Sequence, residues 1–158
     1  MKKVFFAFAL FFILALGMAF AQNYLKTKNL IPKKIPTATI DGHTFELRVA
    51  RSEKEKEIGL SETESLPENK AMIFLFEKPA YYSFWMKNMT MPIDIIYINN
   101  DEIVTIEKNV QPPTSPTESL NIFMPAKPAN RVLEIQAGLS EKYNFKEGDK
   151  VKYENLSN

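Results

Sequence analysis

The chain has 158 residues, enough for one globular domain with a short segment to spare. Lys and Arg number 20 and Asp and Glu number 19, so the formal charge of +1 offers little attraction to a phosphate backbone, and we do not expect nucleic acid as a partner. There is no cysteine, and His43 is the single histidine. These counts exclude disulfides, thiolate or His-rich metal sites and cysteine nucleophiles, and we expect no metal and no cofactor.

Residues 1–21 have the pattern of an export signal. Lys2 and Lys3 precede an uninterrupted apolar run of 18 residues, 4–21, which ends in the small-residue pattern Ala-Phe-Ala that precedes a cleavage site. As a helix this run would be about 27 Å long, close to the ~30 Å hydrocarbon core of a bilayer, so it is either a cleaved signal peptide or a retained N-terminal anchor. In both cases the rest of the chain crosses the membrane, and the predicted location is extracytoplasmic: periplasmic, secreted or anchored to the outer face of the cytoplasmic membrane. Contact with the membrane is expected only through residues 4–21, if they are uncleaved.

The remainder divides into a linker, one domain and a tail. Residues 22–36 are polar and basic with two prolines and no sustained hydrophobic period, which indicates a linker. From residue 37 the pattern changes to short apolar or alternating runs separated by turn residues. We therefore expect a single β-rich domain at 37–154, followed by a tail at 155–158.

The first elements of this domain have clear local signals. Residues 37–40 and 44–49 flank Asp41-Gly42, a dipeptide typical of a hairpin turn. Ser52 and Glu55 have the Ser-x-x-Glu spacing of a capping box, which predicts a short helix that ends at Gly59, before a polar loop at 61–69.

Further strands are predicted at 71–76, 82–86, 93–98, 102–110, 131–136 and 150–153, because these runs are short and most are rich in β-branched or aromatic residues. Residues 111–119 contain three prolines and predict an exposed loop. A helical turn is expected at 138–143, and Gly148 lies in a turn that requires a positive φ. The predicted fold is mainly β: a compact antiparallel β-sandwich or barrel, jelly-roll-like, with one or two short helices.

Five blocks along the domain resemble the domain of unknown function family 192. They are Gly59-Leu60, Met72-Ile73-Phe74, Phe84-Trp85-Met86-Lys87-Asn88 with Pro92-Ile93-Asp94-Ile95, Val132-Leu133-Glu134 with Ala137-Gly138, and Gly148-Asp149-Lys150-Val151. The resemblance runs from about Thr44 to Tyr153 and is most specific in the Trp-Met-Lys-Asn block. It implies a compact, jelly-roll-like β-sandwich with short helices in an exported or membrane-associated bacterial or archaeal protein, and it implies no established activity.

This sequence departs from the family pattern at two places. The family usually has Met and a nearby Arg after the Gly-Leu pair, where this chain has Ser61-Glu62-Thr63. It usually has Gly before the Met of the next strand, where this chain has Ala71. If that arginine contacts a ligand in relatives, the contact is in doubt here.

Two carboxylates lie among aliphatic residues of predicted strands, Asp94 between two isoleucines and Glu134 between Leu133 and Ile135. A buried carboxylate must be paired, hydrogen-bonded or protonated, because desolvation of the bare charge is costly. Three roles stay open: a structural partner of Lys87, Arg131 or backbone amides; a ligand contact; or an acid and base pair like that of glycoside hydrolases. The sequence does not establish whether the two side chains meet.

Trp85 and Lys87 share one face of the predicted 82–86 strand, with Tyr82, Phe84 and Met86 on the other face. An aromatic plane beside an ammonium group and the amide of Asn88 is a reasonable platform for a sugar ring. The alternative for Trp85 is core packing. We interpret His43 as a surface residue, and the acids Asp101, Glu102, Glu147 and Asp149 as turn residues without the spacing of a calcium loop.

The leading hypothesis is an exported, non-enzymatic β-domain that binds a small polar ligand, a cell-wall glycan fragment or an envelope protein through Trp85, Lys87, Asn88 and Asp94. The first alternative is a hydrolase that uses Asp94 and Glu134 as acid and base. The second is a scaffold that docks to another envelope protein, for which an exposed apolar patch would be the sign.

Overall fold

The computed structural model describes residues 16–22, 24, 34–61, 63–115 and 118–157. Residues 16–22 and 24 are helical, and most of the predicted export signal and linker lies outside the described residues, so both remain predictions. No helix among the described residues is long and apolar enough to cross a bilayer. The chain divides into two units, residues 1–34 and residues 35–158.

The compact unit 35–158 is built mainly from strands, which confirms the predicted fold class. Its elements in chain order are β1 (Thr37–Ile40), β2 (His43–Ala50), α2 (Glu53–Ile58), β3 (Lys70–Ala80), β4 (Ile93–Asn99), β5 (Glu102–Val110), β6 (Ala129–Gln136), α3 (Leu139–Lys142) and β7 (Val151–Glu154).

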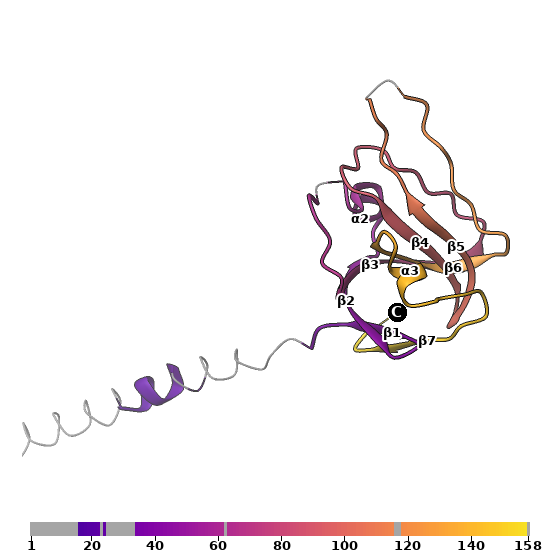
Figure 1. Cartoon of the computed structure of the whole chain (residues 1–158). Helices are drawn as coiled ribbons and strands as arrows, with labels where there is room; N and C mark the ends of the chain where they lie inside the picture. Colours follow the sequence, from indigo (N-terminus) through magenta and orange to yellow (C-terminus); the bar gives the residue numbers. More distant parts are fainter. Residues whose placement is uncertain (1–15, 23, 25–33, 62, 116–117, 158) are drawn as a thin grey trace, which may run out of the picture. The chain divides into compact units, whose positions relative to one another are not determined.

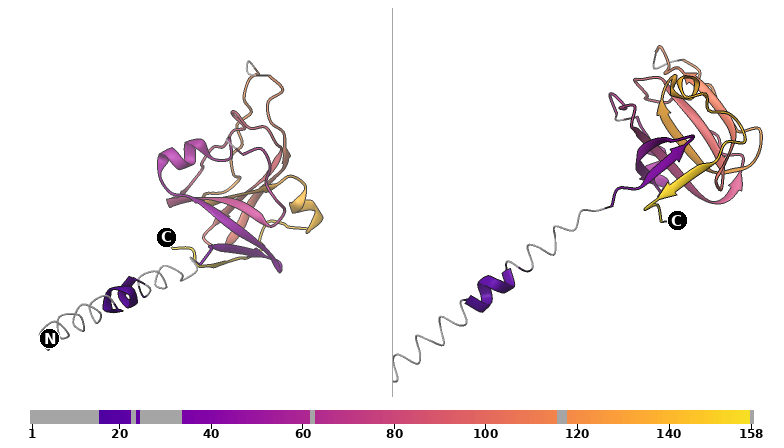
Figure 2. Two further views of the ribbon diagram at one scale, coloured as in Figure 1. Left: turned by 90° about the vertical axis from the view of Figure 1, so that its left-hand side faces the viewer. Right: turned by 60° about the horizontal axis from the view of Figure 1, so that its bottom comes forward.

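The seven strands form a single sheet in the order β5-β4-β6-β3-β2-β1-β7. The sheet curls into a half-barrel (Figure 1), and the right-hand view of Figure 2 shows the strands wrapping around the interior. Backbone hydrogen bonds join the two ends of the sheet order: the Ile103 N–H donates to Asp149 O (3.0 Å) and the Val151 N–H donates to Asp101 O (2.8 Å). Gly148 has the positive φ, 91°, that the turn pattern predicted.

The sheet is mixed, whereas the sequence pattern predicted antiparallel strands throughout. β2 and β3 are parallel, with Leu47 opposite Ala71 and Val49 opposite Ile73. The connection between them contains α2, and a crossover through a helix is what a parallel pair requires. A capping box begins this helix: the Glu55 N–H donates to Ser52 Oγ (3.3 Å), and the Ser52 N–H donates to Glu55 Oε2 (2.8 Å).

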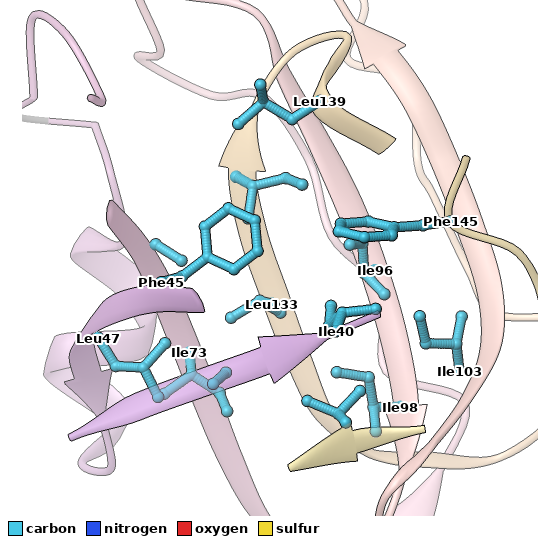
Figure 3. Close-up of a cluster of buried hydrophobic side chains, with 14 residues drawn as sticks. Ile40, Phe45, Leu47, Ile73, Ile96, Ile98, Ile103, Leu133, Leu139 and Phe145 are labelled. Atoms are coloured by element: carbon cyan, nitrogen blue, oxygen red, sulfur yellow. The ribbon is translucent and has the colours of Figure 1, made fainter. Parts of the chain in front are cut away.

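Each face of the sheet buries its own core. The inner cluster fills the half-barrel (Figure 3) and includes Ile40, Phe45, Ile73, Ile96 and Leu133. The outer cluster lies on the opposite side of β3, β6 and β4, and side chains from the loop at 81–92, together with Phe123, pack against it. Its main members are Met72, Phe74, Met86, Met91, Ile93, Ile95, Tyr97 and Val132. Because both faces of the sheet are covered, some strands have continuous apolar sequences, and others alternate apolar and polar residues.

The prediction of a strand at 82–86 is wrong. This segment is a loop that makes one isolated bridge, in which the N–H groups of Phe84 and Phe123 each donate to the other residue's carbonyl (2.9 Å). The Tyr97 hydroxyl also donates to Phe123 O (2.9 Å), so the bridge is held against β4. The predicted alternation survives without a strand: Met86 is buried and Phe84 is half-buried, while Trp85 and Lys87 are exposed.

Candidate functional site

Asp94 lies on β4, is completely buried, and faces the inner cluster. Its carboxylate accepts hydrogen bonds from three backbone N–H groups: Oδ1 from Asn109 (2.7 Å) and Gly138 (3.0 Å), and Oδ2 from Ser140 (2.8 Å). Amide donors of this kind replace the water that the carboxylate loses on burial. Asp94 is therefore a structural clamp between the end of β5 and the start of α3.

The backbone at two of these donors is adapted to the contact. Asn109 has φ 51° and Gly138 has φ 84°, and each of these left-handed turns carries its N–H toward Asp94. Gly138 is also the residue before α3. Of the three roles left open for Asp94, the structural one accounts for this arrangement, because the carboxylate is completely buried and bonded to backbone amides.

Glu134 lies on β6 and faces the outer cluster, opposite Met72 on β3 and Ile95 on β4. Its exposed fraction is 6%, and its Oε2 atom has no hydrogen-bond partner among the described residues. Burial raises the pKa of this carboxyl to about 8, and the charge of Arg48 opposes that rise only in part. Glu134 is therefore mainly protonated at neutral pH.

Arg48 shares a row across the sheet with Glu134, because Arg48 pairs with Met72 and Met72 pairs with Glu134. Its guanidinium donates to the carbonyl of Gly59, to Thr63 Oγ1 (3.3 Å) and to the Met72 sulfur (3.1 Å). These contacts direct the cation to the end of α2, so it does not form an ion pair with Glu134.

Asp94 and Glu134 do not come together. Ile95 is the residue directly opposite Glu134, whereas Asp94 is opposite Ile135. Paired residues point to the same face and successive residues to opposite faces, so the two carboxyls lie on opposite sides of the sheet. The acid and base pair proposed from the sequence is therefore not formed.

A cavity of about 420 Å³ lies beside Glu134, between α2 and the loop that carries Trp85. Four aromatic rings besides that of Trp85 line it, together with charged side chains from α2 and Lys87. The aromatic members are Phe74, Phe76, Tyr82, Phe84 and Trp85, and the polar or charged ones include Glu53, Lys56, Glu57, Ser83, Lys87 and Glu134. We call this cavity the Glu134 pocket.

The rings of the pocket pack against one another in a fixed geometry. Phe74 meets Phe84 edge-to-face with ring centroids 5.0 Å apart, and Phe76 stacks on Tyr82 with centroids 3.6 Å apart. Lys56 places its ammonium 4.6 Å from the centroid of the Phe76 ring and pairs with Glu53 (3.0 Å). The pocket thus has rigid aromatic walls and a few convergent polar groups, as small-molecule sites commonly do.

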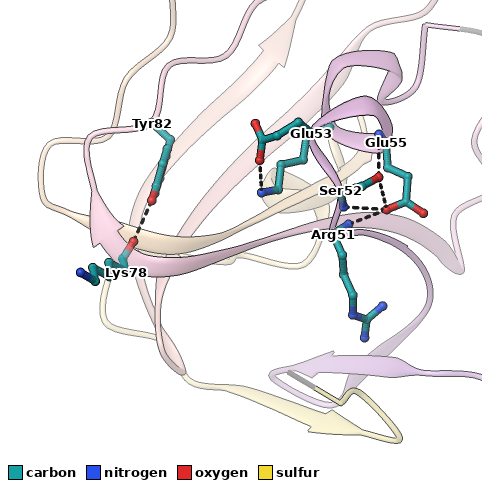
Figure 4. A network of polar contacts seen from close by, with 7 residues as sticks. Arg51, Ser52, Glu53, Glu55, Lys78 and Tyr82 are labelled. Atoms are coloured by element: carbon teal, nitrogen blue, oxygen red, sulfur yellow. Dashed lines mark hydrogen bonds and ion pairs between the residues drawn. The ribbon is translucent and has the colours of Figure 1, made fainter.

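The position of α2 decides which charged groups reach the pocket. Figure 4 shows Ser52 and Glu55 of the capping box, with Glu53 on the same helix; Glu53 pairs with Lys56. The Tyr82 hydroxyl, in the same figure, donates to Lys78 O (2.9 Å). Backbone and side-chain hydrogen bonds from Ser52 and the Arg51 N–H hold the pKa of Glu55 down at about 2, so the cap stays charged over the physiological range. The capped first turn fixes Glu53, Lys56 and Glu57 over the sheet.

Of the remaining predicted site residues, Trp85 and Lys87 line the Glu134 pocket and Asn88 does not. Trp85 is 51% exposed and lies at the pocket with Lys87, so the core-packing alternative for Trp85 is wrong. Asn88 is exposed with φ 59° and does not line the pocket. His43 is partly exposed and stacks on Tyr143 with ring centroids 3.8 Å apart. The described residues contain no group of three acidic, histidine or cysteine side chains placed to hold a metal ion.

Sequence reasoning missed the contributions of Lys56, Phe76 and Tyr82. Tyr82 follows the predicted alternation, but nothing in the local pattern shows that α2 lies over it. The signal available was the length of the connection between residues 49 and 71, which is sufficient for a crossover with a helix over one face.

Comparison with known proteins bears on the fold and the family. The family model DUF192, described as "Uncharacterized ACR", matches residues 36–153. A crystal structure of a protein of unknown function from Novosphingobium aromaticivorans is 34% identical, with a TM-score of 0.65, and the match covers 73% of this chain and 83% of that one. A crystal structure of a putative transcription regulator from Sinorhizobium meliloti is 24% identical, with a TM-score of 0.66, covering 77% of this chain and 95% of that one, and it supports the fold alone.

No curated protein matches the chain. The family model covers most of the domain, and the Novosphingobium protein shares more than 30% identity over most of its length. The resemblance found in the sequence blocks is thereby confirmed, and the chain belongs to the DUF192 family.

Proposed function

We propose that this protein is a non-enzymatic, extracytoplasmic binding domain that holds a glycan fragment in the Glu134 pocket. The observation that carries the proposal is the unpartnered Oε2 of Glu134, a buried polar atom beside a cavity with aromatic walls. A buried polar atom without a partner is rare in native proteins and needs an explanation. A ligand hydroxyl or carbonyl in the pocket supplies the missing partner.

The chemistry of the lining fits a sugar ring. A pyranose has an apolar face that stacks on an aromatic side chain and a rim of hydroxyls that need hydrogen bonds. Trp85 offers the exposed ring, and Ser83, Lys56, Lys87 and protonated Glu134 offer donors. An export signal, as predicted at residues 1–21, would deliver the domain to the compartment where cell-wall glycan is found.

The hydrolase alternative receives less support. An acid such as protonated Glu134 needs a second carboxylate across the scissile bond. Asp94 lies on the opposite face of the sheet from Glu134, and its two oxygens accept hydrogen bonds from three backbone N–H groups. It therefore does not serve as that second carboxylate.

One observation favours docking to an envelope protein as a second candidate. Trp85 and Ile122 flank the bridge between Phe84 and Phe123. The exposed fractions of Trp85, Ile122 and Met124 are 51%, 54% and 50%. Exposed apolar side chains gathered in one place mark interaction surfaces. Ile122→Lys would weaken such docking and leave glycan binding unchanged, because Ile122 does not line the Glu134 pocket.

The experiment is a glycan-array screen of the full-length protein, followed by titration calorimetry with the glycan that binds. We expect Trp85→Ala to weaken binding by about tenfold or more, as loss of an aromatic contact does. Tyr81→Ala is the matched control, because Tyr81 is an aromatic residue exposed to 55% that does not line the pocket.

Two substitutions at Glu134 test the hydrogen bond. Glu134→Gln keeps the shape and a donor, so binding should persist. Glu134→Leu removes the donor, and affinity should fall by about tenfold. If Glu134→Leu binds as well as the wild type, or Tyr81→Ala is as damaging as Trp85→Ala, the pocket is not the glycan site.

A further inference from the structure

A second cavity, of about 700 Å³, adjoins the Glu134 pocket. Both cavities are lined by the same four residues, Glu53, Lys56, Phe76 and Tyr82. The shared residues form a compact unit, since Lys56 contacts both Glu53 and the Phe76 ring, and that ring stacks on Tyr82. The two cavities are therefore two halves of one groove that follows α2.

The second half opens where β3 separates from β6. The strands pair up to Leu75 and Arg131 and then lose register until Ala80 pairs with Ala129. Such an irregularity widens the space between neighbouring strands and redirects side chains. Here it leaves Glu77 facing the groove, close to the Asn100 turn.

The far end of the groove is polar and charged, with Arg51 and Arg131 beside Glu77, unlike the aromatic Glu134 pocket. Arg51, Asn100, Asn130 and Arg131 line it. Arg51 donates to the carbonyl of Ser157 (2.6 Å), and the guanidinium of Arg131 lies 5.0 Å from the centroid of the Tyr153 ring. Arg131 also donates to the carbonyl of Asn100, and Asn100 and Asn130 hydrogen-bond to each other. These contacts fix the polar groups of this end, where the exposed guanidinium of Arg51 presents its charge to the hydroxyls or carboxylates of a ligand.

We infer that the groove binds an extended glycan chain: one sugar in the Glu134 pocket and at least one further sugar at the Arg51 end. This inference rests on the proposed function and names its ligand more closely. Each cavity alone lies within the range of about 300–1,000 Å³ that accommodates a drug-sized ligand, so one sugar ring fills only part of the groove. The shared wall of Phe76 and Tyr82 supplies an apolar surface between the two subsites.

The test uses β-1,4-linked N-acetylglucosamine chains of one to six sugars as probes for the full-length protein, by ligand-observed NMR for the shortest and calorimetry for the longest. The hexamer should bind about tenfold or more tightly than the monosaccharide, because the second subsite acts on an already tethered ligand. Arg51→Met should lower affinity for the hexamer by about threefold to tenfold and leave the monosaccharide unaffected. Lys54→Met is the matched control, because Lys54 is an exposed cation on α2 that lines neither cavity.

Three results would overturn the inference. Equal affinity for all chain lengths removes the second subsite and leaves the Glu134 pocket intact. Equal losses for monosaccharide and hexamer in Arg51→Met show that Arg51 acts through the fold and not at a separate subsite. Failure of every chain to bind removes the extended-glycan inference together with glycan binding in the Glu134 pocket.

Discussion

Asp94 and Glu134 lie on neighbouring strands, in adjacent cross-strand rows, and both are buried, yet their surroundings differ completely. Asp94 accepts three backbone hydrogen bonds, whereas one oxygen of Glu134 has no partner among the described residues. The same chemical group therefore stabilises the fold on the inner face and lacks a partner on the outer face, where we propose that a ligand contacts it. Burial alone does not identify a functional carboxyl; the supply of donors around it does.

The largest expected effect is at Asp94. Asp94→Ala leaves the N–H groups of Asn109, Gly138 and Ser140 without their acceptor, and the free energy of unfolding should fall by roughly 3–5 kcal/mol. Asp94→Asn keeps the shape and one acceptor, so its loss should be smaller, roughly 1–3 kcal/mol. Urea denaturation measures both. An unchanged midpoint in Asp94→Asn, with reduced glycan binding, would move Asp94 from the structural to the functional side of the comparison.

The second prediction concerns the pH dependence of stability through Glu134. Its pKa is about 8 in the folded protein against 4.5 for an unburied glutamate, so the folded state binds the proton more tightly than the unfolded state does. Stability should therefore fall as pH rises from 4.5 to 8, by up to about 1.4 kcal/mol per pH unit. Denaturation at several pH values should show this slope in the wild type and a smaller one in Glu134→Gln. Equal slopes in the two proteins would show that Glu134 is not held protonated.

The third prediction separates the Asp94 clamp from ordinary turn strain. Gly138 and Gly42 both have φ 84° and open space at the Cβ position, but only Gly138 donates to Asp94. Each change to Ala introduces left-handed strain of about 1–2 kcal/mol. Gly138→Ala should cost more than Gly42→Ala in thermal denaturation, because its shifted N–H also weakens the bond to Asp94. Equal costs would mean that the clamp tolerates movement of this donor.

The smallest effects on stability are expected on the Glu134 side. Trp85 is half exposed and Lys87 is exposed, so Trp85→Ala should change the free energy of unfolding by less than about 1 kcal/mol, and Lys87→Met by less than about 0.5 kcal/mol. Differential scanning calorimetry provides the measurement. A loss of several kcal/mol in Trp85→Ala would restore its interpretation as a core residue.

Local signals in the sequence predicted the local structure well. β1 and β5 have the predicted bounds, and the Ser52–Glu55 spacing forms the predicted capping box, because each depends on residues close together in the chain. The parallel pairing of β2 with β3 is a property of the sheet as a whole, and strand patterns alone did not reveal it.

The candidate site was predictable only in part, for the same reason. The aliphatic neighbours of Asp94 and Glu134 correctly indicated burial. The donors that distinguish the two come from far away, since Gly138 and Ser140 lie 44 and 46 residues after Asp94. The outward alternation predicted for Trp85 and Lys87 persists in a loop, but the cavity that they line depends on the placement of α2.

The most direct test of the division between the two carboxyls is a ¹³C NMR titration of the Glu134 side-chain carboxyl in the full-length protein, with Glu134→Gln to assign the resonance. A midpoint near pH 8 is the predicted result, because the carboxyl is buried without a partner for Oε2. A midpoint at or below 4.5 would show that the carboxylate is solvated or paired, and would contradict its assignment as the group kept open for a ligand.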